Sequence, residues 1–404
     1  MRCNVPKVLE SLKGFSLKDM PEFMTREQYK GKMEAIVEKY NLRDLIRFHT
    51  FVTAVRPTDK LSEEDRKEAG LPAEKAADEK AMTVLTCKSD DMAAKETHQF
   101  DYVVVCSGRT VTPHIPKIEG ADTFPGFQFH ARDYRRPDPE KFHEKRIAVL
   151  GTVNSGNDYA IEYFINPKVT ETVKVAKMFW IGNPMPVENS SDYKEHYESG
   201  RIVLKNGLSK IDGSKLVFAD GTEEEVDTIV YATGYKWNFP FLREDDGVIA
   251  YEENQKYYGP LYKLMVAINE PHLMFVGMLD CPGQSFGYSR QAMVAKEIIA
   301  GNVKLPSKEE MKADMDKYEE GFRKGGMLRY FATFTPFSSS MWDYGDSLYE
   351  LVKHIYKKDE VAEKEIKAAE AEVWNRIIKG NWHAVRFQHY EGVDQDIFVD
   401  DKLF

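Results

Sequence analysis

The order of apolar and polar positions divides the first quarter of the chain into one amphipathic helix and several strands. Apolar residues recur with helical spacing from 26 to 40, which predicts a helix with one apolar side. The apolar runs at 45–55, 81–88 and 100–108 predict strands, the last of them continuous and buried. The charged stretch at 57–80 predicts a solvated loop. Together these elements predict a small antiparallel meander that returns to a parallel core strand.

Further along the chain, buried strands alternate with helices. The strand RIAVLG (146–151) runs directly into a helical pattern at 157–164. Further strands are predicted at 177–182, within 201–235 and at 272–278, a helix at 289–301, and mainly helices after it. Alternation of this kind is typical of an α/β protein with parallel sheets.

Two of the buried strands end in turns of the same type. The turn CSG lies at 106–108, and the turn ATG lies at 232–234. Each consists of small residues and follows a strand that reads as part of a core sheet. We interpret the two turns as equivalent positions that bracket one inserted domain.

The link between the strand at 146–151 and the next helix resembles a dinucleotide-binding loop. The stretch GTVNSG has Gly151 and Gly156 at the first and third glycine positions of G-x-G-x-x-G, with Val153 at the second. The first glycine makes the tight turn, the second lets the backbone approach the pyrophosphate, and the third lets helix and strand pack closely. The phosphates then lie on the free N–H groups at the helix start.

Two features of this loop keep a purely structural turn as an alternative. The β-branched Val153 disfavours a positive φ and fills the space through which a phosphate would approach. NAD sites carry an acid about 20 residues further on and NADP sites an arginine, whereas IGNP (181–184) offers neither. The loop by itself therefore fits either a nucleotide site or a strand–turn–helix without a ligand.

Composition and charge exclude several classes of function. The chain has 404 residues and a net charge of −10 without a basic stripe, so no nucleic-acid partner is expected. Its apolar runs are too short for a transmembrane segment, and its first residues lack the apolar block of a secretory signal. The four cysteines are scattered, so neither disulfides nor a metal site is predicted. A cytoplasmic location follows, with peripheral attachment to a membrane left open.

A second motif lies just before the nucleotide loop. The stretch FPGFQFHARDY (124–134) places Phe124, Gly126, His130 and Tyr134 in the pattern F-x-G-x-x-x-H-x-x-x-Y. This pattern resembles the identifying sequence of the flavin-containing monooxygenases, in which it also comes immediately before the nucleotide loop. Further similar segments are RCNVPK (2–7), ATGYKWNFPFL (232–242) and RQAMVAKEIIAGNVKLPSKEEM (290–311). The resemblance thus extends along nearly the whole chain.

The resemblance implies a fold, two cofactors and a reaction. It implies two Rossmann-like domains, with an NADPH domain at 141–239 inserted into an FAD domain formed by 1–140 and 240–404. It implies FAD and NADPH as cofactors, and O2 and a small amine or sulfide as substrates. NADPH reduces the flavin, O2 forms a C4a-hydroperoxyflavin, and a soft nucleophilic nitrogen or sulfur takes the distal oxygen. A homodimer is left open.

The same resemblance implies roles for individual residues. Asn4 matches the family asparagine beside the flavin and the nicotinamide, and is the expected catalytic residue. The expected cofactor-binding residues are Gly151, Asn154, Ser155 and Gly156 at the NADPH pyrophosphate, Thr233 and Gly234 at the crossover between the domains, and Gln291 at the flavin ring. A turn role for Asn4 and an ordinary helix-start role for Gln291 are the alternatives. His130 and Tyr134 are interpreted as structural residues that tie the two domains by hydrogen bonds.

One segment of the family pattern is absent from the sequence. The family begins with a βαβ unit that carries G-x-G-x-x-G for FAD, but this chain has only three glycines before Gly108. We therefore expect the chain to start after that unit, which comprises at least ~30 residues. A truncated, non-catalytic relative that acts as a pseudoenzyme or interaction protein is the main alternative.

A third hypothesis comes from a different motif. The stretch GQSFG (283–287) matches G-x-S-x-G, the nucleophile elbow of serine hydrolases, with Ser285 as nucleophile. That elbow needs its serine on a sharp turn between an abutting strand and helix. Here the preceding strand ends near Met278, and Pro282 and Gly283 lengthen the loop. This sequence context disfavours the hydrolase.

The affinity for FAD tests the expectation that the βαβ unit with G-x-G-x-x-G is absent from this chain. The 404-residue chain should bind FAD weakly or not at all, because the adenine and pyrophosphate lack a glycine-rich cradle. A copy extended at its N-terminus by a G-x-G-x-x-G unit should bind FAD tightly. The flavin-to-protein ratio, taken from the visible spectrum after desalting, measures the difference. Stoichiometric FAD in the short chain would contradict this expectation.

Overall fold

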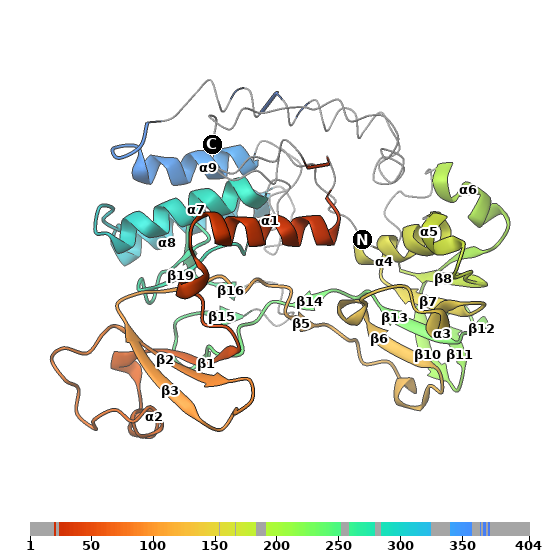
Figure 1. The fold of residues 1–404 in the computed structure, drawn as a ribbon, viewed down its shortest axis with the longest axis horizontal. Helices are drawn as coiled ribbons and strands as arrows, with labels where there is room; N and C mark the ends of the chain where they lie inside the picture. The colour runs from red at the N-terminus through yellow and green to blue at the C-terminus, as the bar shows by residue number, and fades with distance from the viewer. Residues whose placement is uncertain are drawn as a thin grey trace. The chain divides into compact units, whose positions relative to one another are not determined.

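The chain forms two compact units (Figure 1). The computed structural model describes residues 20–21, 24–152, 154–165, 167–182, 191–251, 258–278, 284–324, 340–357, 364, 367–368 and 371. Among these, Thr112–Tyr235 and residue 371 belong to unit 1, and the remaining described residues up to 368 belong to unit 2. In sequence, unit 1 is thus an insertion within unit 2, and its main segment begins and ends shortly after the CSG and ATG turns.

Unit 1 is built on a five-stranded sheet in which all neighbouring strands are parallel. Its strands are β6 (Phe127–His130), β7 (Arg146–Leu150), β8 (Lys177–Ile181), β9 (Ile202–Lys205) and β13 (Thr228–Tyr231). They lie in the order β6-β13-β7-β8-β9. The three central strands are the apolar runs of the sequence and are almost entirely buried, as expected when both faces of a parallel sheet are covered. The predicted α/β class is confirmed.

The two faces of this sheet are covered by different layers. Along β7, Ile147 and Val149 join a core with helical residues, whereas Ala148 and Leu150 join a core with a small antiparallel sheet. The helical elements of unit 1 are η4 (Ala121–Thr123), η5 (Ala131–Asp133), α3 (Pro139–Phe142), α4 (Asn154–Ala160), the π-helix η6 (Ile161–Ile165), α5 (Pro167–Thr170) and α6 (Ser191–Glu198). The antiparallel sheet is β10 (Leu208–Asp212), β11 (Lys215–Phe218) and β12 (Glu223–Glu225). The two-residue alternation of side chains along a strand produces this division.

The main segment of unit 1 starts before the residue 141 that the sequence predicts for the inserted domain. Its first strand, β5 (Thr112–Pro113), pairs with β14 (Tyr235–Lys236), where the chain leaves the unit. The next strand, β6, is an integral part of the parallel sheet. The residues from 112 onward are therefore held to unit 1 by backbone hydrogen bonds.

Unit 2 combines an antiparallel meander with a second mixed sheet. Its first part contains α1 (Arg26–Lys39), η2 (Arg43–Leu45), β1 (Thr50–Pro57), η3 (Thr58–Lys60), α2 (Glu63–Glu68), β2 (Met82–Lys88), β3 (Lys95–Phe100) and β4 (Val103–Val105). Its second part contains β15 (Ala250–Tyr251), β16 (Tyr258–Gly259), β17 (Leu261–Tyr262), β18 (Val266–Ala267), β19 (Leu273–Phe275), α7 (Gln284–Ile299), α8 (Lys308–Lys324) and α9 (Ser340–Val352). The meander β1-β2-β3 is antiparallel, as predicted, and β4 pairs in parallel with β19.

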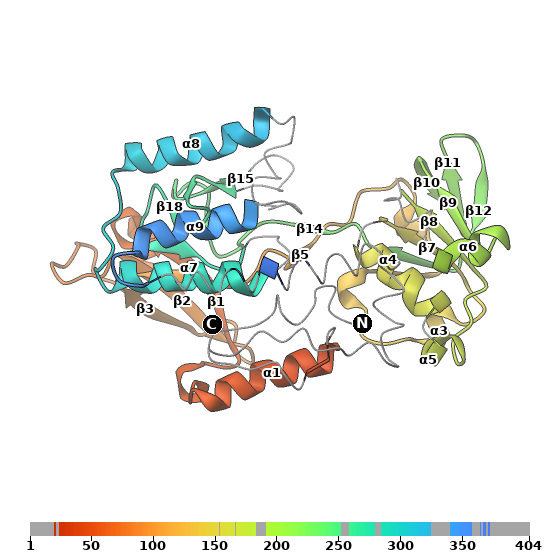
Figure 2. The same cartoon turned by 90° about the horizontal axis from the view of Figure 1, so that it is seen from above.

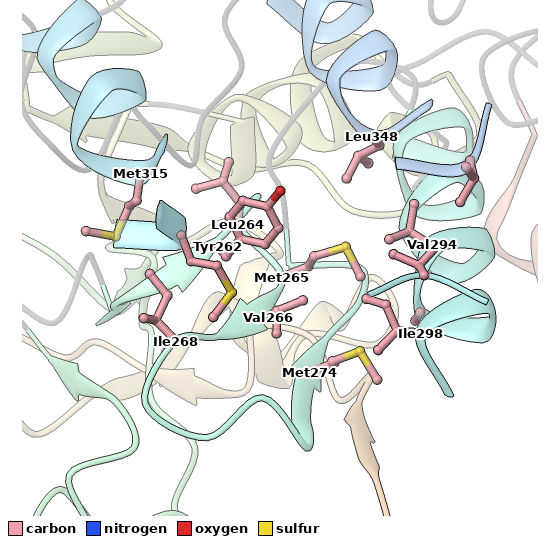
Figure 3. Packing of buried hydrophobic residues seen from close by; sticks show 14 of the residues in the cluster. Tyr262, Leu264, Met265, Val266, Ile268, Met274, Val294, Ile298, Met315 and Leu348 are labelled. Atoms are coloured by element: carbon pink, nitrogen blue, oxygen red, sulfur yellow. The ribbon is translucent and has the colours of Figure 1, made fainter. Parts of the chain in front are cut away.

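The mixed sheet of unit 2, β17-β18-β19-β4, packs on helices. In Figure 2, α7 and α9 lie side by side. Figure 3 shows the core between the sheet and the helices, to which Met265 and Met274 contribute from the sheet side and Val294 and Leu348 from α7 and α9. Within the described residues, no helix is both long and apolar enough to cross a membrane.

Several predicted boundaries were wrong, and local chemistry explains the largest difference. The stretch 57–80 is not a solvated loop, because Ser62 and Asp65 form a capping box that starts α2. Asp65 and Arg66 are buried despite their charge. The predicted strand at 45–55 begins only at Thr50, and the single strand predicted at 100–108 is divided between β3 and β4.

A cluster of ion pairs holds α2 to the rest of unit 2. Arg243 donates two hydrogen bonds to the carboxylate of Asp65, each 2.9 Å long, and a third of 3.0 Å to Asp246. Arg56 lies 3.8 Å from Asp65 and 3.9 Å from Asp246. The bonds from Arg243 hold the pKa of Asp65 well below its usual range. The cluster joins β1, α2 and the chain near residue 245, which are far apart in sequence.

Loss of Arg243 should destabilise unit 2. Arg243→Met leaves Arg56 as the arginine within 4 Å of both of these nearly buried carboxylates, and should lower the free energy of unfolding by about 2–4 kcal/mol, near the range measured for broken buried pairs. Urea unfolding measures this change. The control is Arg43→Met, which breaks the exposed Arg43–Glu38 pair and should leave the free energy of unfolding nearly unchanged. Equal effects of the two substitutions would contradict the assignment.

Candidate functional site

The candidate site lies at the carboxyl ends of the central strands of unit 1. From β7 the chain adds β8 and β9 on one side, whereas β13 lies on the other side of β7. Open α/β sheets bind ligands outside the carboxyl ends of the strands at such a change of direction. The last residues of β7 and β13, Leu150 and Tyr231, are direct neighbours in the sheet. The two turns that follow them, at Gly151 and at Ala232, form the candidate site.

The turn at Gly151 has no room for a side chain. Gly151 has a φ of +112°, and a Cβ there would lie 2.3 Å from the carbonyl oxygen of Ala232. Its N–H donates to the carbonyl of Ile181 at 2.9 Å, and its carbonyl accepts from the indole Nε1 of Trp180 at 3.0 Å. Two hydrogen bonds and the contact with Ala232 therefore hold this residue in place. Glycine fits the position because it has no Cβ and adopts a positive φ readily.

Gly156 brings the helix against this turn. A Cβ at Gly156 would lie 1.9 Å from the carbonyl oxygen of Gly151. The first and third glycine roles of the dinucleotide loop, the tight turn and the close helix–strand packing, are thus both present. Helix α4 begins at Asn154, three residues after Gly151, so the N–H groups of its first turn, which have no partner within the helix, belong to the end that follows this turn.

The ATG turn is fixed by the segment that precedes the sheet. The Thr233 hydroxyl donates to the carbonyl of His114, and the carbonyl of Gly234 accepts from the His114 N–H at 2.9 Å. The same Gly234 carbonyl is 2.9 Å from Nε2 of His130. Because its own polar groups are held in this way, the turn after β13 keeps one shape beside Gly151.

His130 has a structural role, as predicted. Its side chain is buried, and its Nδ1 accepts from the N–H of Arg132 at 3.1 Å, which leaves Nε2 to donate to Gly234. Burial lowers the pKa of the imidazole, so the neutral form is favoured. A neutral histidine with both ring nitrogens hydrogen-bonded stabilises the ATG turn.

The remaining residues of the F-x-G-x-x-x-H-x-x-x-Y motif are also structural. Phe124 is buried in the core beneath the sheet, and a Cβ at Gly126 would lie 2.3 Å from the carbonyl of Asp227. The Tyr134 hydroxyl is 3.2 Å from that of Tyr163. The expectation that His130 and Tyr134 tie two domains together was wrong, because these hydrogen bonds lie within unit 1. Both residues instead join the connector to its own unit.

The structure describes some of the other predicted site residues and leaves others outside the described ranges. Asn4 and Val153 lie outside the described residues. Asn154 is the first residue of α4 and Ser155, half-buried, is the second. The structure thus brings Gly151, Ser155 and Gly156 to one turn, next to the Thr233 and Gly234 turn.

Gln291 and Ser285 both lie in α7 of unit 2. Gln291 is fully buried, accepts from the N–H of Gly277 at 3.0 Å and donates to the Tyr344 hydroxyl at 2.8 Å. These bonds link α7 to α9, and a contact of Gln291 with the flavin stays a prediction. Ser285 is the second residue of α7, whereas the preceding strand ends at Phe275. The serine is therefore not on a turn that abuts a strand, as a nucleophile elbow requires.

Two residues that shape the turn were not predicted from the sequence. Trp180 anchors the carbonyl of Gly151, and Ala232 is the neighbour that excludes a side chain at position 151. A large aromatic residue near the end of KMFWIG was the available signal for Trp180. Nothing in the sequence indicates the contact of Ala232, since it depends on the pairing of β7 with β13.

Unit 2 also has an open turn at the carboxyl end of parallel strands. Gly108 follows β4 and has a φ of +77°, and among the residues that the structure describes nothing lies within 4 Å of a Cβ placed there. Gly277 follows the neighbouring strand β19 and has a φ of +82°. Backbone with free space at such an edge fits the approach of a second nucleotide cofactor.

The protonation of His130 should make the stability of the chain depend on pH. Because the folded pKa of His130 lies below its ordinary 6.5, the unfolded chain binds more protons just below that pH, and the free energy of unfolding falls as the pH drops through it. His130→Gln keeps a donor for Gly234 and should reduce the loss of stability between about pH 7.5 and pH 5.5. Burial also lowers the pKa of His196, which should supply the remaining dependence. Urea midpoints at the two pH values measure this.

His49→Gln is the matched control for this experiment, because the His49 side chain is exposed. It should leave the pH dependence as in the unmodified chain. A pH dependence that His130→Gln does not change would contradict the role of His130.

Comparisons with known proteins agree with this geometry. The model of the flavin-binding monooxygenase-like family matches residues 2–177 and 187–372, and that of a pyridine nucleotide-disulphide oxidoreductase family matches residues 92–263. The chain is 30% identical over 346 residues to a trimethylamine monooxygenase of Pelagibacter sp. (strain HTCC7211), covering 84% of this chain and 69% of that protein. It is 29% identical over 313 residues to senecionine N-oxygenase of Tyria jacobaeae, covering 77% of this chain and 60% of that protein.

Two solved structures share the fold. S-allyl-L-cysteine S-oxygenase from Allium sativum has a TM-score of 0.70 at 21% identity, with 95% of this chain and 80% of that chain covered. The Pelagibacter protein Tmm has a TM-score of 0.70 at 23% identity, with 95% and 78% covered. The predicted arrangement of two Rossmann-like domains is confirmed by these neighbours. The chain therefore belongs to the flavin-binding monooxygenase-like family, as an NADPH-dependent flavin monooxygenase with FAD and NADPH as its cofactors.

Proposed function

We propose that the chain uses NADPH and O2 to oxygenate a soft nucleophilic nitrogen or sulfur atom of a small molecule, with the β7–α4 turn as the NADPH site. The observation that carries this proposal is the pair of glycines at the change of strand direction. Gly151 and Gly156 lie where an added Cβ would strike backbone, directly beside the ATG turn. A flavin monooxygenase of this family needs a pyridine nucleotide, and the first and third glycines of this turn support its assignment to that role.

Each residue of the turn has a distinct part in this proposal. Gly151 and Gly156 keep side chains out of the turn, so that the pyrophosphate can reach the first N–H groups of α4 at the positive end of the helix. Asn154 and Ser155, the first two residues of α4, add polar contacts there. Thr233 and Gly234 form the neighbouring wall, and their hydrogen bonds to His114 and His130 keep that wall in place.

The flavin has fewer described residues to support it. Bound FAD, reduced by NADPH, supplies the activation of O2 that no side chain can provide. The backbone at Gly108 is open for its approach, and Asn4 is the proposed polar support beside the ring. The protein's part is then to position the two cofactors and to exclude water.

The substrate class is inferred from relatives. Trimethylamine monooxygenase and senecionine N-oxygenase are named for oxidation of amines, and the Allium enzyme is named for oxidation of sulfur. Nitrogen and sulfur atoms of these kinds share a soft lone pair. We therefore propose a small tertiary amine or sulfide as substrate, converted to its N-oxide or S-oxide.

Substitutions in the turn test the NADPH site. Gly151→Val should lower NADPH affinity at least about tenfold, because the side chain collides with Ala232 and displaces the turn. Val153→Gly should not weaken binding, since it restores the second glycine of the motif. Isothermal titration with NADPH measures affinity. Anaerobic bleaching by NADPH measures hydride transfer in the FAD-loaded copy that carries the N-terminal G-x-G-x-x-G unit. Oxygenation is then read as N-oxide formed from trimethylamine.

Gly213→Asn is the matched control, because Gly213 has a φ of +57° in a hairpin of the same unit and a Cβ there meets nothing within 4 Å. Asparagine tolerates this conformation, so NADPH binding should not change. Full NADPH affinity in Gly151→Val would overturn the proposed site. A large loss in Val153→Gly would show that the valine is packed for another purpose.

A further inference from the structure

Unit 2 contains a cleft whose lining includes none of the residues of the turns already described. It has a volume of about 360 Å³ and lies between α8, α9 and the turn that joins β17 to β18. Its apolar lining includes Leu261, Leu264, Met315 and Tyr318. Volumes of this size and mainly apolar walls are typical of small-molecule pockets.

The floor of the cleft is an unusual turn. Lys263 and Leu264 both have positive φ, 49° and 52°, although neither is a glycine. They are the central residues of a turn closed by the hydrogen bond from the Met265 N–H to the Tyr262 carbonyl. Asparagine or glycine ordinarily occupies such positions, because a side chain is disfavoured at positive φ. The Tyr344 hydroxyl donates to the carbonyl of Lys263 at 2.8 Å and so helps to hold the turn from α9. Figure 3 shows Leu264 beside Tyr262, with Met315 of α8 on the same side of the core.

One polar group in the cleft has unused hydrogen-bonding capacity. The Lys263 ammonium is 2.8 Å from a carboxylate oxygen of Asp314 and 5.5 Å from the centre of the Tyr262 ring. Its side chain is only 17% exposed. Among the described residues Asp314 is its one hydrogen-bond acceptor, so two of its three N–H groups remain to donate. Ser347 also lines the cleft, but its hydroxyl already donates to the carbonyl of Tyr344.

We propose that this cleft binds a small amphipathic carboxylate. Its apolar body lies on Leu264, Met315 and Tyr318, and its carboxylate accepts from the Lys263 ammonium. Lys317 also lies in the lining, so that the charged groups of the cleft are two ammonium groups, those of Lys263 and Lys317, and the two carboxylates of Asp314 and Asp343. Because the Lys263 side chain is largely buried and donates only once, an acceptor placed there gains a charge-assisted hydrogen bond. The site is separate from the nucleotide turns and does not depend on the proposed function.

Binding can be measured without cofactor or turnover. Anilinonaphthalene sulfonate, an aromatic anion that fluoresces in apolar surroundings, serves as the reporter, and octanoate serves as the competitor. The full chain should show one saturable site from which octanoate displaces the dye. Ser347→Trp should fill the cleft and abolish this site. Lys263→Met should keep the volume but weaken octanoate about tenfold or more, as expected for loss of a hydrogen bond to a charged group.

Glu350→Trp is the matched control, because it adds the same indole to an exposed position of α9 outside the cleft. It should leave dye and octanoate binding unchanged. Circular dichroism and urea midpoints show whether each variant is folded, and the two cleft variants test the site independently. Unchanged octanoate competition in a folded Ser347→Trp, or in a folded Lys263→Met, would overturn the proposal, as would failure of octanoate to displace the dye.

Discussion

The close approach of two turns is the constraint on which the candidate nucleotide site depends. The turn after β7 lies against the turn after β13, with the carbonyl of Ala232 occupying the space that a side chain at position 151 would need. From the neighbouring strand β8, the indole of Trp180 donates to the carbonyl of Gly151, and the carbonyl of Ile181 accepts from the Gly151 N–H. Because parallel strands end at one edge, this packing brings a helix start and two small-residue turns together without any catalytic side chain.

The motif that identifies the family is, in this chain, a support for that edge. Phe124 anchors the connector in the core, Gly126 lets it pass close to Asp227, and His130 fixes the carbonyl of Gly234. Tyr134 continues the connector onto the helical face through Tyr163. A flavin monooxygenase leaves the difficult chemistry to its cofactor, so residues that keep the cofactor's surroundings rigid serve the reaction as directly as an acid or a base does.

Unit 2 shows a different use of polar side chains. Gln291 joins the N–H of Gly277 to the hydroxyl of Tyr344, which in turn bonds the carbonyl of Lys263. This chain of hydrogen bonds crosses from β19 through α7 and α9 to the β17–β18 turn. It positions the strained Lys263–Leu264 turn beneath the amphipathic cleft, while the Asp65–Arg243 pairs hold the meander. Buried polar groups satisfied in this way favour one arrangement of elements over others, since a misplaced partner leaves a buried group unbonded.

The sequence by itself determined the three central strands of unit 1, the parallel α/β class, the family and the position of the candidate nucleotide turn. Continuous apolar runs and the spacing of Gly151 and Gly156 are local properties, so they can be read along the chain. Only the tertiary structure decided that Trp180 and Ala232 shape that turn, that Gln291 is an internal link, and that the charged stretch near Asp65 is partly buried. Each of these depends on partners between 14 and 178 residues away, and pairing at such distances leaves no periodic pattern in the sequence.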